Sequence, residues 1–69
     1  MKKAEIIENI IIVLNYAQEH KQYRLDVLDA LEKFNIVWSL SNERMKRKLN
    51  RISRIKLMDV MHDVVESIY

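Results

Sequence analysis

The stretch of this sequence with the clearest chemical character is NERMKRKLNRISRIK, from Asn42 to Lys56. Residues 43–56 carry seven Lys or Arg and one acidic residue, a net charge of +6 in a chain whose total is +2. Basic side chains along a helix can follow a nucleic-acid backbone and release its counterions. Arginine also offers a planar fork to phosphate or to guanine edges. The segment therefore predicts binding to an anionic partner, and nucleic acid is the first candidate.

Helical spacing divides this basic segment into two faces. Met45, Leu49 and Ile52 repeat at intervals of three and four residues and form the apolar face. The candidate nucleic-acid-binding residues lie opposite: Arg44, Arg47, Lys48, Arg51, Arg54 and, for contacts to bases, Asn50. Charges of a single sign repel one another, so solubility alone does not account for them. The alternative partners are an acidic protein, or the acidic residues 59–66 of a second subunit.

The residue types needed for catalysis are sparse. The chain has no cysteine and no glycine, which excludes thiolate nucleophiles, G-x-S-x-G elbows and glycine-rich phosphate loops. One helical face of residues 59–66 gathers Asp59, His62, Asp63 and Glu66. Di-metal bundles use Glu-x-x-His pairs from two helices, and this chain supplies a single Asp59-x-x-His62. We expect this cluster to be a solvated helix face, and we expect no enzymatic activity, cofactor or metal.

Helices must position the basic segment, because glycine and proline are both absent and tight β turns depend on such residues. Apolar residues at helical spacing predict a first helix over residues 3–19 and a second over residues 25–37. Ser41 or Asn42 is a natural N-cap for a further helix from residue 43. A break near Ser53 is predicted by two apolar stripes that do not join smoothly, with one long helix over residues 41–69 as the alternative.

These elements predict an all-α fold, a small bundle of three or four helices, with residues 1–69 forming one domain. Domains of this size bury a limited share of their surface, and the first helix is apolar nearly all round. We therefore expect a homodimer whose interface includes Ile11, Ile12, Tyr16 and Trp38. The longest apolar run, Ile10 to Leu14, is too short to span a bilayer and does not resemble a signal peptide. A cytoplasmic protein without membrane contact is the expected class.

Residues 34–69 carry a partial resemblance to a known family. FNIVWSLSNERMKRKLNRIS, followed by a short helix, resembles the ribbon-helix-helix repressors, in which two chains pair a short strand that precedes two helices. The resemblance implies a DNA-binding dimer in which Lys33, Asn35 and Val37 face the groove. The sequence departs from the family pattern in the apolar Val37, in the lack of glycine between the helices and in its long helical N-terminal segment.

The leading interpretation is a small regulatory module without enzymatic activity that binds nucleic acid through the helix at residues 43–56. The competing interpretation is a protein-binding inhibitor or adaptor, of the kind found among small phage or plasmid regulators, that acts through apolar helix surfaces. A ribbon-helix-helix-like DNA-binding dimer is the third.

Overall fold

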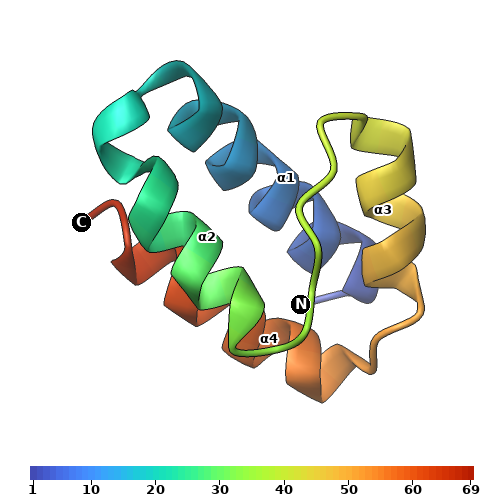
Figure 1. Ribbon diagram of the computed structural model, residues 1–69. Coiled ribbons are helices and arrows are strands. Elements are labelled where there is room, and N and C mark those ends of the chain that lie inside the picture. Colours follow the sequence, from blue (N-terminus) through green and yellow to red (C-terminus); the bar gives the residue numbers. More distant parts are fainter.

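The computed structural model describes residues 1–69 and is entirely helical apart from its connections (Figure 1). The prediction of an all-α bundle with three or four helices is confirmed. In chain order the elements are α1 (Lys3–Glu19), the short 3-10 helix η1 (Lys21–Tyr23), α2 (Arg24–Glu32), α3 (Asn42–Asn50) and α4 (Arg54–Glu66). The longest of them, α1, has 17 residues, and no helix is both long and apolar enough to cross a membrane.

Helix α1 is the centre of the structure. It packs most extensively on α4 and also contacts α3 and α2. Sixteen residues are buried and all are hydrophobic; seven of these belong to α1. The later helices of the same chain cover the apolar side of α1, and the expected homodimer remains a prediction. Ile11, a predicted interface residue, is only 4% exposed and lies inside this core.

The exposed surface area shows how compact the single chain is. The structure exposes 4793 Å². A folded monomer of 8.3 kDa is expected to expose about 4,600 Å². The single chain is therefore about as compact as an ordinary monomeric domain of its size.

Helix α2 ends five residues before the predicted end at Val37, and Asn35 explains why. Asn35 has a φ angle of 58° and is the only residue in the left-handed region. Its N–H donates to the carbonyl oxygen of Glu32 at 3.0 Å, and the N–H of Ile36 donates to that of Leu31 at 3.1 Å. These two bonds, together with the burial of Ile36 and Leu31 in the same core cluster, match the Schellman motif that terminates helices. In a chain without glycine, asparagine takes the left-handed position that glycine usually occupies.

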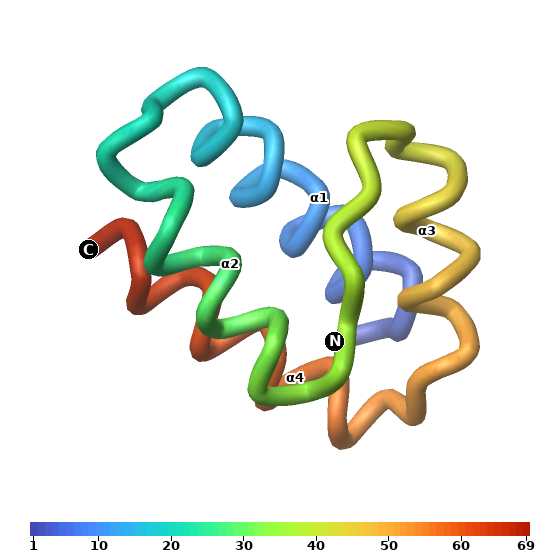
Figure 2. The backbone as a smooth tube through the Cα atoms, in the orientation of Figure 1, coloured from blue at the N-terminus to red at the C-terminus, as the bar shows by residue number.

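After Asn35 the chain runs extended to the start of α3, as the tube in Figure 2 shows. Ser41 is the N-cap of α3, and its Oγ accepts a hydrogen bond from the N–H of Arg44. This confirms one of the two predicted cap residues. Helix α3 ends at Asn50, and Ser53 caps α4 in the same way through the N–H of Lys56. The predicted break near Ser53 is confirmed, and the alternative of one long helix is wrong.

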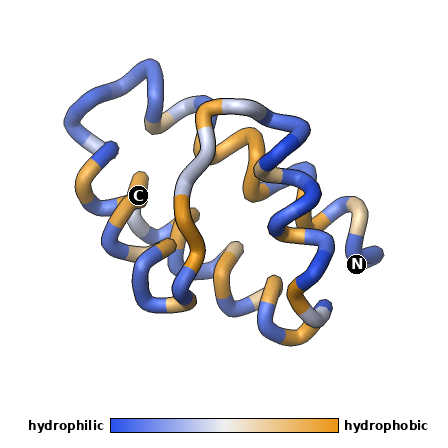
Figure 3. Tube along the Cα trace, turned by 45° about the vertical axis from the view of Figure 1, so that its right-hand side comes forward, coloured by the Kyte–Doolittle hydropathy of each residue, from blue (hydrophilic) through white to orange (hydrophobic).

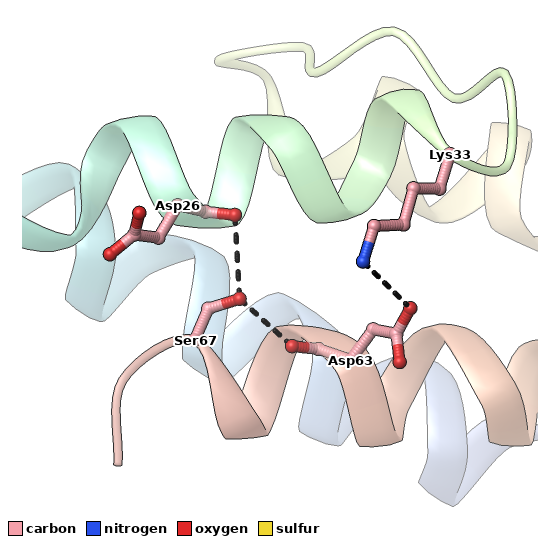
Figure 4. Close-up of polar contacts among 4 residues, drawn as sticks. All are labelled: Asp26, Lys33, Asp63 and Ser67. Carbon is pink, nitrogen blue, oxygen red and sulfur yellow. Dashed lines mark hydrogen bonds and ion pairs between the residues drawn. The ribbon is translucent and has the colours of Figure 1, made fainter.

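Polar contacts join α2 to the C-terminal half of α4 (Figure 4). The hydroxyl of Ser67 donates to the carbonyl oxygen of Asp63 at 2.9 Å and also lies 3.4 Å from the carbonyl oxygen of Asp26. The ammonium of Lys33, at the C-terminal end of α2, lies 4.0 Å from the carboxylate of Asp63. These contacts join the C-terminal half of α4 to α2.

Candidate nucleic-acid interface

Helix α3 lies at the edge of the molecule and is anchored by two side chains. Met45 is 1% exposed and Leu49 is fully buried, while the other seven residues of the helix are exposed. Buried side chains at positions i and i+4 define one narrow stripe along a helix. Through this side α3 packs on α1. The trace of α3 in Figure 3 is accordingly mostly hydrophilic in colour. The predicted division of this helix into an apolar and a basic face is confirmed.

Most basic side chains of α3 point to solvent without an acidic partner. The chain has two ion pairs, and in residues 43–56 only Lys46 takes part in one, at 3.6 Å from Glu8 of α1. The guanidinium groups of Arg44, Arg47 and Arg51 make neither an ion pair nor a hydrogen bond within the chain. Two free arginines on α3 and a third at its C-cap, Arg51, leave a concentrated positive field that an external anion can neutralise.

Two of the predicted nucleic-acid-binding residues also hold the local structure together. The ammonium of Lys48 donates to the carbonyl oxygen of Val37 at 3.1 Å and so ties the extended segment to α3. Nε of Arg54 donates to the carbonyl oxygen of Met1 at 2.8 Å. Arg54 is the first residue of α4 and therefore does not lie on α3 with the other basic residues. We call Arg44, Arg47, Lys48 and Arg51 the basic ridge.

Asn50, predicted to contact bases, is the last residue of α3 and is exposed. Its carbonyl oxygen accepts a hydrogen bond of 2.7 Å from the ammonium of Lys3, at the start of α1. A lysine at this position satisfies one of the free carbonyl groups at a helix C-terminus. The C-terminal end of α3 is therefore attached to α1, while the side-chain amide of Asn50 remains without a partner in the chain.

Acidic side chains gather on another part of the surface. A groove of about 480 Å³ between α2 and α4 is lined by Asp26, Asp29, Asp63 and Glu66, with Lys33 as the only cation. This acidic groove shares no residue with α3. Asp59 and His62 are exposed on α4, and no group of three His, Asp or Glu side chains is arranged to hold a metal ion.

The four predicted interface residues do not form one surface. Ile12 and Tyr16 are 58% and 41% exposed and border an apolar groove of about 550 Å³ between α1 and α4. The α4 side of this groove comes from Met61, Val65 and Ile68, which sequence spacing alone could not pair with α1. Trp38 lies on a different surface, beside α2, and Ile11 is in the core.

The strand implied by the ribbon-helix-helix resemblance has no counterpart as a paired strand. Lys33 lies at the C-cap of α2, and Asn35 has a left-handed backbone, so only Val37 of the three proposed reader positions is in the extended segment. Side chains at these positions therefore do not alternate along one strand, as the resemblance requires. What the segment does share with that pattern is an extended conformation directly before two helices.

Tyr16 contacts two other aromatic rings near the end of α1. Its ring stacks on that of His20 with 4.0 Å between centroids, and it lies 5.8 Å from that of Tyr23. His20 and Tyr23 therefore belong to the packing of the α1–α2 connection, which is distant from the basic ridge along the chain.

No protein-family model matches this chain, and neither the curated proteins nor the solved structures contain a match to it.

Proposed function

We propose that the chain is a nucleic-acid-binding module without enzymatic activity and that the basic ridge on α3 contacts the phosphate backbone. The observation that carries this proposal is the set of three arginines, Arg44, Arg47 and Arg51, that have no partner within the chain. Phosphate contacts of this kind supply most of the affinity of proteins that bind nucleic acid without sequence preference.

The start of α4 adds to the positive field beside the ridge. The first turn of α4 contains Arg54 and Lys56 and no acidic residue. Cations at a helix N-terminus are unfavourable, because that end of the helix dipole is already positive. A phosphate group bound near the turn between α3 and α4 would relieve this repulsion.

The proposal is tested by measuring the binding of a fluorescent duplex DNA as a function of salt concentration. Four cations in the ridge predict a slope of about −4 in a plot of log K against log salt, at about −0.9 per phosphate contact. Replacing Arg47 and Arg51 by alanine should reduce the slope to about −2 and weaken binding to all sequences alike.

The matched control removes the same charge from a different surface. Lys21 of η1 and Arg24 of α2 are exposed and belong to other elements than α3 and the basic ridge. The double variant Lys21→Ala/Arg24→Ala should therefore keep the full slope. Equal losses in the two double variants would mean that net charge, rather than the ridge, attracts DNA. Absence of binding to both duplex and single-stranded DNA at low salt would refute the proposal.

A second candidate function is the binding of another protein chain through the groove between α1 and α4. The observation that favours it is composition, since seven of the eight residues that line this groove are hydrophobic. Apolar surfaces that a monomer leaves open are frequent sites of association. The first partner to test is a second copy of the chain, by sedimentation at micromolar concentration.

Ile12 provides the discriminating variant for this second function. Its side chain is 58% exposed at the edge of the groove, so Ile12→Lys should preserve the fold while introducing a charge. We expect the variant to sediment as a monomer where the unmodified chain sediments as a dimer. Leu25→Lys, at a residue that is 73% exposed on α2, is the control. If the unmodified chain sediments as a monomer, self-association is refuted, and the partner that the groove binds would have to be a different protein.

A further inference from the structure

A third, smaller groove runs beside the basic ridge. It has a volume of about 280 Å³ and lies between residues 34–37 on one side and Lys48, Arg51 and Ile52 on the other. Lys48 and Arg51 are members of the basic ridge, so the groove opens directly along it. Phe34 is half-buried against the core, and Ile52 is also half-buried, which makes the groove apolar below a cationic rim.

The walls of this groove are held in place by backbone contacts. The hydrogen bond from Lys48 to the carbonyl oxygen of Val37 joins one wall to the other. The left-handed Asn35 turns the chain at the groove, and the two hydrogen bonds that close α2 fix its backbone. The side-chain amide of Asn35 is exposed and has no hydrogen-bond partner in the chain. It can offer a donor and an acceptor at a fixed position.

These features fit one chemical class of ligand. A nucleobase has a flat apolar face that stacks on aromatic rings and a polar edge that pairs with amides, and its phosphates require cations. In a duplex the faces of the bases are stacked on one another, so only an unpaired base can present its face to a protein. The groove combines a phenylalanine, an amide and two cations of the ridge within one small volume.

We propose that this groove binds a base of a single-stranded nucleic acid whose phosphates follow the basic ridge. The inference rests on the proposed function and specifies its substrate: single strands are preferred over duplexes. Phe34 supplies the stacking surface, Asn35 contacts the edge of the base, and Lys48 and Arg51 contact the adjacent phosphates.

Fluorescence anisotropy with an oligothymidine of about 12 nucleotides, and with the corresponding duplex, tests this inference. We expect the single strand to bind more tightly at every salt concentration. Phe34→Leu, which retains an apolar side chain of similar size, should weaken binding to the single strand at least about fivefold, as expected for loss of one stacked base. Because phenylalanine carries no charge, the slope of log K against log salt should be the same for Phe34→Leu as for the unmodified chain. Duplex affinity should also be unchanged.

Two further variants guard against a change in folding. Asn35→Gly retains a residue that accepts the left-handed backbone, so it should keep the fold while weakening single-strand binding. Tyr69→Leu removes an aromatic ring that is 94% exposed and does not line this groove, and it should have no effect. Thermal melting checks that each variant is folded.

The outcomes separate this inference from the function on which it rests. Equal affinity for single strand and duplex, with no loss of affinity in Phe34→Leu or Asn35→Gly, would overturn the inference. If Arg47→Ala/Arg51→Ala still weakened binding in that case, the proposed role of the basic ridge would stand. Absence of binding to both probes at low salt would overturn both.

Discussion

A comparison of Leu49 with Leu25 tests which side chains anchor α3. Each is a leucine in a helix of nine residues, α3 and α2 respectively. The side chain of Leu49 is fully buried, whereas Leu25 is 73% exposed. We predict that replacing each leucine by alanine will give very different losses of stability, because the two substitutions remove the same atoms from opposite environments.

The expected magnitudes follow from burial. Truncation of a fully buried leucine removes its transfer free energy and leaves a cavity, at a cost of about 2 to 5 kcal/mol. Leu25→Ala should change stability by less than about 0.5 kcal/mol, because its side chain is mostly solvated and both residues favour helices. A domain of this length has a total stability of about 3 to 10 kcal/mol, so the Leu49 variant can lose most of it.

Urea denaturation followed by far-ultraviolet circular dichroism measures both effects. With a slope of about 1 kcal/mol per molar urea, Leu49→Ala should lower the midpoint by about 2 M or more. Its melting temperature should fall by about 8 °C or more, from about 4 °C per kcal/mol. Leu25→Ala should retain the original midpoint. Similar losses in the two variants, or a Leu49 variant of normal stability, would refute the packing of α3 on α1.

Three further predictions concern the ends of helices and metal ions. Asn35→Ala should destabilise the chain by about 1 kcal/mol, whereas Asn35→Gly should be neutral or slightly stabilising; equal melting temperatures would argue against a left-handed cap. Ser53→Ala should cost about 1 kcal/mol in a urea titration and Ser53→Asp should not, since aspartate also caps and adds favourable negative charge at the start of α4. Addition of a chelator should leave the melting temperature unchanged, and a shift of several degrees would indicate a metal site near Asp59 and His62.

The predicted extent of α1, from near Lys3 to about Glu19, agrees with the structure, because its apolar spacing is uninterrupted and its polar ends coincide with the ends of the pattern. The sequence also predicted the turn between α3 and α4. Ser53 lies there, and the chain changes there from a basic segment, residues 43–56, to an acidic one, residues 59–66. In both cases the signal is local, and nothing distant in the chain opposes it.

The end of α2 was mispredicted for an identifiable reason. Phe34 and Trp38 continue the helical spacing of the preceding residues, so periodicity favours a longer helix. The structure instead turns at Asn35 and buries Ile36, which is 7% exposed, in the core. Asparagine is a weaker signal for a helix end than glycine, and the gain from burying Ile36 depends on the tertiary structure.

Prediction of the candidate site was limited in the same way. The outward face of α3 could be read from the spacing of Met45 and Leu49, since a helix determines its own faces. The bonds from Lys48 to Val37 and from Arg54 to Met1 join residues that are distant along the chain, and no local pattern contains them. The groove beside the ridge depends on the first of these contacts and was therefore invisible to sequence reasoning.

The central position of α1 has a consequence for synthesis on the ribosome. Residues 3–19 are made before α4, which follows them by more than thirty residues and covers them most extensively. At about 5 to 20 residues per second, the apolar side chains of α1 wait on the order of 2 to 10 seconds for their native partner. During that interval they are exposed to chaperones and to other nascent chains. Translation speed, rather than the intrinsic rate of helix formation, therefore sets the earliest moment at which this domain can fold.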